Sequence, residues 1–108
     1  MKVVVIGSSN IDMVAQVSHL PAPGETVGDA NFMQSLGGKG ANQAVAAARL
    51  GGFVTFVTSL GNDMYADILK NHFKKEGITT DYIIDDVNHP TGTALIFVAD
   101  SGENCIAV

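Results

Sequence analysis

A glycine-rich turn that opens directly into an alanine-rich helix constrains the fold of this chain more than any other feature. The turn is Gly37-Gly38-Lys39-Gly40, and the segment from Gly40 to Leu50 consists mostly of strong helix formers. Gly51-Gly52 follows, and glycine readily adopts the left-handed conformation that commonly ends a helix. The pattern therefore predicts a helix over 40–50 whose first turn is shaped by a loop of small residues.

Other segments predict strands that alternate with helices. Val3 to Ile6 is a continuous β-branched run ended by Gly7, which is typical of a parallel strand covered on both faces. A second helix is expected over 63–76, capped by Asn62 or Asp63 and ended by Gly77. The remaining strands are predicted at 12–17, 31–36, 53–58, 80–84, 93–99 and 104–108. Strands that alternate with helices indicate βαβ units, so the predicted class is α/β.

Four of these strands, at 12–17, 31–36, 93–99 and 104–108, are expected to form a small accessory sheet beside the α/β layers. The strand at 93–99 is apolar on both faces, so we expect both faces to be covered. A hairpin turn is predicted at 100–103, and an acidic, solvated turn at 85–90.

Length and composition predict one domain over 1–108 and exclude several classes of protein. With 46% hydrophobic and 16% charged residues the chain is too apolar to be disordered, and part of its apolar surface is expected to meet a partner. The net charge is −5, without the clustered Lys and Arg that nucleic-acid binding needs. The apolar N-terminal run is too short for a signal peptide or a membrane span. Cys105 is the only cysteine, so no internal disulfide forms and a reducing, cytoplasmic location is expected.

The glycine-rich loop does not match the known nucleotide-binding loops. A P-loop needs Ser or Thr after its lysine, whereas Gly40 follows Lys39. The dinucleotide fingerprint needs a third glycine where Gln43 stands, and it should follow the first strand. What remains is a loop that lets the backbone approach a ligand closely.

Several groups of this loop suit a ligand rich in oxygen. The N–H groups of Gly40 and Ala41 lie at the start of the predicted helix, Lys39 adds a cationic donor, and Asn42 offers both a donor and an acceptor. From these residues alone, a purely structural role, in which the glycines only tighten a strand-to-helix turn, stays equally open.

A second candidate group is Asn10-Ile11-Asp12, directly after the first strand. Ligands of open α/β sheets bind beyond the carboxyl ends of the strands. Alternate residues of an extended segment share a side, so Asn10 and Asp12 would point together while Ile11 turns inward. A carboxylate can accept hydrogen bonds from two neighbouring hydroxyls of one sugar. A polar turn with a solvated Asp12 is the alternative that these residues leave open.

These motifs together resemble a known family. The pattern Gly37-Gly38-x-Gly40-x-Asn42-x-Ala44, with Gly51 and Gly61 further on, is similar to the N-terminal signature of the ribokinase-like, or PfkB, carbohydrate kinases. Asn10-x-Asp12 and the segment from Pro23 to Thr26 also stand where the family has them. Lys39 is similar to the members that act on ribose, whereas many fructokinase-like members carry other residues there.

The resemblance implies the N-terminal part of a three-layer α/β/α domain with a small β-sheet lid. The complete enzyme would use ATP, Mg²⁺ and a monovalent cation to phosphorylate D-ribose to ribose 5-phosphate, and would form a homodimer through its lid strands. Ala94 and Ile96 would line the lid. The substrate-binding residues that the resemblance implies are Asn10, Ile11, Asp12, Gly38, Lys39, Gly40, Ala41 and Asn42.

The family also implies what this segment lacks. Such kinases hold the catalytic aspartate, the ATP pocket and the cation site in the later part of a longer chain. No catalytic, cofactor-binding or metal-binding residue is therefore expected within 1–108, and the segment alone is expected to be inactive.

Two alternatives stay open, and some residues are assigned no site role. The substrate could be another sugar or a nucleoside, or the chain could be a non-catalytic module that dimerises or binds another protein through its apolar strands.

The three histidines are too far apart in sequence for a metal site. Cys105 is expected in the core or the lid, and Asp63 and Asp67 are placed to complement the start of the second helix.

Overall fold

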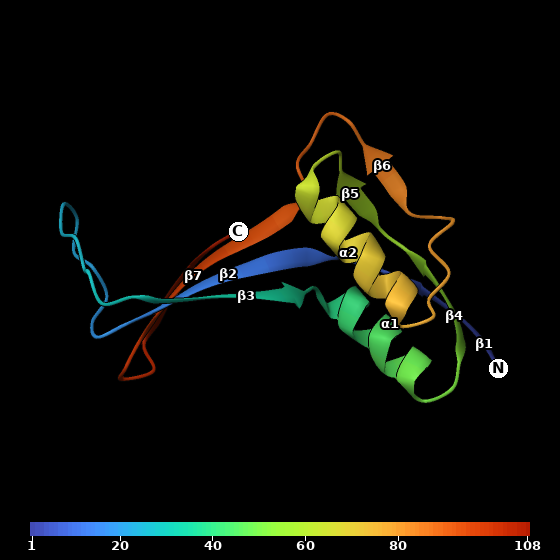
Figure 1. Cartoon of the computed structure of the whole chain (residues 1–108), viewed down its shortest axis with the longest axis horizontal. Helices are drawn as coiled ribbons and strands as arrows, with labels where there is room; N and C mark the ends of the chain where they lie inside the picture. The colour runs from blue at the N-terminus through green and yellow to red at the C-terminus, as the bar shows by residue number, and fades with distance from the viewer. The chain divides into compact units, whose positions relative to one another are not determined.

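The structure, a computed structural model, describes all of residues 1–108, which divide into two compact units (Figure 1). The first unit holds Met1–Ile11 and Leu36–Gly92, and the second holds Asp12–Ser35 and Thr93–Val108. The elements in chain order are β1 (Lys2–Ile6), β2 (Asn10–Val17), β3 (Asn31–Gly37), α1 (Lys39–Arg49), β4 (Phe53–Val57), β5 (Ser59–Gly61), α2 (Met64–Lys75), β6 (Ile84–Asp86), β7 (Gly92–Ala99) and β8 (Asn104–Ala107).

The first unit is built from parallel strand pairs, as the alternation of strands and helices predicted. β1 pairs with β4 in a register that joins Lys2 to Phe53 and Ile6 to Val57. β5 pairs with β6, and α2 connects these two parallel strands. The α/β class is confirmed.

The two helices begin and end close to where the sequence placed them. α1 ends before Gly51, which has φ 93° and supplies the expected left-handed residue. α2 is capped by Asp63, whose carboxylate accepts a hydrogen bond from the Ala66 N–H at 2.9 Å. Gly77, with φ 75°, follows its end. Neither helix has the length and apolar character that crossing a bilayer requires.

The strand predicted at 80–84 is wrong in position. The Ile83 N–H donates to the Thr80 carbonyl at 3.2 Å and closes a turn there, while the Ile84 N–H donates to the Thr58 carbonyl at 2.8 Å and starts β6. Asp85 and Asp86 therefore lie in a strand instead of the predicted acidic turn. The strand predicted at 53–58 is confirmed as β4 (Phe53–Val57), and a further short strand that was not predicted, β5 (Ser59–Gly61), follows it and pairs with β6.

The helices cover one face of the β1–β4 pair, so the prediction that β1 is covered on both faces is wrong for this chain. α1 and α2 lie on the same side of the strands (Figure 1). On β1 the side chains of Val4 and Ile6 remain 64% and 79% exposed. The core lies on the helix side, where Phe56, Leu60, Leu69 and Phe73 are buried.

The second unit is a four-stranded sheet in the order β3-β2-β7-β8. β7 and β8 form an antiparallel hairpin, closed by hydrogen bonds between the backbones of Ala99 and Glu103 at 2.8 Å and of Gly102 and Ala99 at 2.8 Å. Only one face of β7 is covered, contrary to the prediction, because Leu95 and Phe97 are 53% and 42% exposed. Cys105 is exposed on β8 and is not a core residue.

Phe73 anchors α2 to the sheet, and its removal should destabilise the first unit. Its ring is fully buried and meets Phe56 edge-on, with centroids 5.1 Å apart. We expect Phe73→Ala to lower the free energy of unfolding by about 3–5 kcal/mol, since it removes a buried aromatic ring and leaves a cavity. Urea unfolding of the purified chain measures this change. Phe53→Ala, at a side chain 74% exposed, is the control; equal losses for both variants would contradict the assignment of the core.

Candidate functional site

The glycine-rich loop packs backbone to backbone against the residues that follow β1. Gly38 is the N-cap of α1, with φ 101° and ψ 129°, a conformation that strongly favours glycine. A Cβ atom at Gly38 would lie 2.5 Å from the Ser8 carbonyl oxygen and 2.7 Å from the Ser9 Cα. Glycine is therefore required here both by conformation and by space.

The first turn of α1 is docked in the same way. A Cβ at Gly40 would lie 2.7 Å from the Gly7 Cα, and one at Gly7 would lie 2.9 Å from the Gly40 Cα. The Ala41 N–H donates to the Ser8 carbonyl at 3.0 Å. The N–H groups of Gly40 and Ala41 were both expected to donate to a ligand, but that of Ala41 already donates to the Ser8 carbonyl within the protein.

The structure brings most of the predicted site residues into one unit. Asn10, Ile11 and the segment 38–42 all belong to the first unit, and the backbone at 7–9 that contacts Gly38 and Gly40 leads directly into Asn10. Ile11 is fully buried, as its inward orientation predicted. The side chains of Lys39 and Asn42 are exposed on the first turn of α1. Asp12 is half-buried and starts the part of β2 that belongs to the second unit.

Ser9 is a polar residue beside this loop to which the sequence assigned no role in the site. It is 7% exposed, and its Oγ is buried without a hydrogen-bond partner. Buried hydroxyls are nearly always paired, so such a group is unusual. The sequence offered no signal for this, because serine is mostly exposed in folded proteins and Ser9 lies in the polar run Ser8-Ser9-Asn10.

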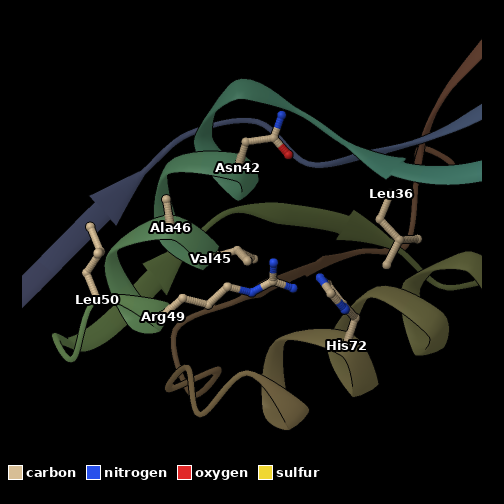
Figure 2. Close-up of a pocket in the computed structure, with 7 residues that line it drawn as sticks. All are labelled: Leu36, Asn42, Val45, Ala46, Arg49, Leu50 and His72. Carbon is tan, nitrogen blue, oxygen red and sulfur yellow. The ribbon is translucent and has the colours of Figure 1, made fainter.

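Asn42 also lines a groove of about 720 Å³ between the two helices (Figure 2). Figure 2 shows the Arg49 and His72 side chains reaching into the space between α1 and α2. At one end the Arg49 Nε donates to Glu76 at 3.0 Å, and this hydrogen bond holds the pKa of the Glu76 carboxyl below its usual value. The full lining is Leu36, Asn42, Val45, Ala46, Arg49, Leu50 and His72, of which only Asn42 was predicted as a site residue.

The titratable side chains do not gather into a metal site. No group of three or more His, Cys, Asp or Glu residues is arranged to hold a metal ion. His19 pairs with Glu25 at 3.0 Å and His89 with Asp86 at 2.9 Å. The residues of this chain therefore provide no cluster that fits the Mg²⁺ implied by the resemblance.

Comparison with known proteins identifies the family. The profile described as the pfkB family carbohydrate kinase matches residues 1–108. The chain belongs to the pfkB family of carbohydrate kinases. It is 47% identical over 104 residues to ribokinase of Haemophilus influenzae, and 46% identical over 108 residues to the bifunctional ribokinase/ribose-5-phosphate isomerase A of Fructilactobacillus sanfranciscensis.

A solved structure supports the same placement of the fold. Ribokinase of Arabidopsis thaliana, solved in complex with ribose and ATP, matches 98% of this pfkB-family chain with a TM-score of 0.90 and 35% identity. The match covers 35% of that protein. The chain likewise spans 34% of the H. influenzae ribokinase and 20% of the bifunctional enzyme. Its fold is the N-terminal portion of a ribokinase-like fold.

The backbone contact at Gly40 generates a prediction about stability. We expect Gly40→Ala to lower the free energy of unfolding by about 1–3 kcal/mol, because the new methyl group would overlap the Gly7 backbone and force α1 away from it. Thermal unfolding measures the loss. Gly28→Ala is the matched control, since a Cβ there meets nothing within 4 Å and the backbone does not have a positive φ. A Gly40→Ala variant as stable as this control would show that the close contact is not required.

Proposed function

We propose that this chain forms the sugar-binding part of an ATP-dependent kinase that phosphorylates D-ribose to ribose 5-phosphate. The observation that carries the proposal is the docking of the loop 38–42 onto residues 7–9, beside Asn10, in a pfkB-family chain. The similarity to a ribokinase solved with ribose and ATP supports ribose as the first substrate to test.

Each proposed contact uses a group suited to a sugar hydroxyl. The Asn10 amide both donates and accepts hydrogen bonds, and the Asp12 carboxylate can accept from two neighbouring hydroxyls. Lys39 and Asn42 project from the first turn of α1, whose position is fixed by the contact between Gly40 and Gly7. A rigidly held first turn places these side chains at little entropic cost when the sugar binds.

In this proposal the chain binds and orients the sugar but does not supply the chemistry. In phosphoryl transfer the sugar hydroxyl loses its proton to a base and bonds to the γ-phosphorus of ATP, while the bond from that phosphorus to the bridging oxygen breaks and ADP leaves. This transfer depends on positioning and charge stabilisation. No residue of this segment is proposed as that base or as an ATP ligand. We therefore propose that the segment alone is inactive and that the complete enzyme works with Mg²⁺ and a monovalent cation in the cytoplasm.

Calorimetry with the full-length gene product tests the proposed sugar contacts. Ribose should bind, and Asp12→Ala should weaken binding by at least about 1 kcal/mol, because a hydrogen bond to a charged group is lost. Asn10→Ala should weaken it in the same direction. Asp81→Ala, which removes an exposed acid from the turn before β6, should leave the affinity unchanged. An affinity insensitive to Asp12 would refute that assignment, and a panel of sugars and nucleosides separates ribose from the alternative substrates.

The second unit supports a further proposal, that two copies of the chain associate through its sheet. Exposed apolar side chains on two strands include Phe32 on β3 and Leu95 and Phe97 on β7. Met13, Ala15 and Ile96 join Phe32, Leu95 and Phe97 around a hollow of about 190 Å³. Contiguous exposed apolar surface of this kind marks interaction sites.

Sedimentation velocity of the full-length gene product tests this association. We expect a dimer for the natural sequence and a monomer for Phe97→Glu, because a buried, unpaired carboxylate is costly in an apolar interface. Lys74→Glu, at an exposed position on α2, is the charge-changing control and should remain a dimer. If the natural protein sediments as a monomer, the proposed dimer is wrong. That result would not affect the proposal of sugar binding.

A further inference from the structure

Asp63 does more than cap α2. One oxygen of its carboxylate, Oδ1, accepts from the Ala66 N–H at 2.9 Å, which is the ordinary role of an N-cap residue. The same carboxylate also binds Thr91, 28 residues further along the chain, through both of its oxygens. A helix cap alone does not need this second set of bonds.

The contacts with Thr91 fix both its backbone and its side chain. The Thr91 N–H donates to Asp63 Oδ2 at 2.9 Å, and the Thr91 hydroxyl donates to Oδ1 at 2.7 Å. That hydroxyl in turn accepts from the Gly61 N–H at 3.0 Å. Thr91 is 2% exposed, so its groups are shielded from water, whereas the Asp63 carboxylate is half-buried. Hydrogen bonds to an ionised carboxylate are stronger than neutral ones, and the Thr91 N–H is the main cause of the lowered pKa of Asp63.

Close packing leaves this segment little freedom to move. A Cβ at Gly61 would lie 2.5 Å from the Thr91 nitrogen and 2.7 Å from the His89 carbonyl oxygen. The end of β5 therefore sits directly on the backbone of 89–91. The chain before β7 is thus held by hydrogen bonds from Asp63 and Gly61 and by close backbone contact with Gly61.

The residue that follows Thr91 reaches the proposed sugar site. A Cβ at Gly92 would lie 3.3 Å from both the Asn10 Cβ and the Ser9 carbonyl oxygen, so the Gly92 backbone packs against the start of β2. The amide group of Asn10 is bonded to this Cβ, so the position of the Cβ determines where the amide lies. Because Gly92 directly follows Thr91 and lies beside the start of β2, a shift of Thr91 is expected to move the backbone next to this atom as well.

We propose that Asp63 is a positioning residue of the sugar site, acting through Thr91 and Gly92 on Asn10. The proposal rests on the sugar-binding function proposed above. Asp63 does not touch the sugar in this account; it holds the segment that supports Asn10. Functional side chains must be held to within about 0.5 Å by such supporting residues to work well.

Asp63→Asn in the full-length gene product tests the proposal. Asparagine is also a good N-cap, so the bond to the Ala66 N–H is retained, but an NH₂ group replaces the oxygen that accepts from the Thr91 N–H. We expect the dissociation constant of ribose, measured by calorimetry, to rise about tenfold, because the Asn10 amide would no longer be held in the orientation that the sugar needs. The KM for ATP should not change. Thr91→Ser, which keeps the hydroxyl, should bind ribose within about twofold of the natural protein.

Asp67→Asn is the matched control for helix stability. Asp67 lies in the first turn of α2 and its side chain is exposed, so the variant loses a favourable charge at the helix start without contacting Thr91. If Asp63→Asn lowers the melting temperature but binds ribose as the natural protein does, Asp63 is only a cap and the proposal is overturned. Should Asp63→Asn fail to fold, Thr91→Val decides the question, because it removes the bridging hydroxyl while leaving the cap in place.

Amide hydrogen exchange without sugar separates this proposal from the proposed function. Faster exchange at residues 9–12 in Asp63→Asn than in Asp67→Asn supports the link to Asn10 even if ribose proves to be the wrong ligand. Faster exchange confined to residues 91–93 overturns it. A natural protein that binds no sugar or nucleoside of the panel refutes the proposed function instead.

Discussion

The contact between Gly40 and Gly7 is the constraint on which the rest of the first unit depends. With no Cβ on either residue, the first turn of α1 lies on the backbone that leaves β1, and the Ala41 N–H reaches the Ser8 carbonyl. This fixes where α1 begins and therefore which side chains its first turn presents. β4 then follows α1 through the Gly51 turn and pairs in parallel with β1.

This contact also separates the packing role of the glycines from a role of the loop in ligand binding. Gly38 and Gly40 are required by packing, which fulfils the purely structural role that the sequence left open. That role and a ligand-binding role are compatible, because close packing of the loop is what holds Lys39 and Asn42 in place. The glycines alone would not have indicated a sugar. The inference that the loop binds a sugar rests on the family assignment. The geometry explains how the loop would hold the side chains that contact the sugar.

Local signals in the sequence predicted the helices well and the short strands poorly. Asp63 and Gly51 mark helix ends through bonds and backbone angles that depend on neighbouring residues only. The position of β6 depends instead on a bond between Ile84 and the Thr58 carbonyl, which no local pattern reveals. The proposed site follows the same division. Asn10 and the loop were predicted from motifs, whereas the burial of the Ser9 hydroxyl and the bonds from Asp63 to Thr91 depend on contacts that only folding creates.

Two supports of different origin converge on the short segment that leads from β1 into β2. The start of α1 reaches it through Gly38, which packs on Ser9, and the start of α2 reaches it through Asp63, Thr91 and Gly92, which packs on Asn10. Both supports therefore reach the segment that follows the carboxyl end of β1, the position where ligands of open α/β sheets commonly bind. A segment held from two sides can present Asn10 in one orientation, and an amide that must match particular sugar hydroxyls gains most from such restriction.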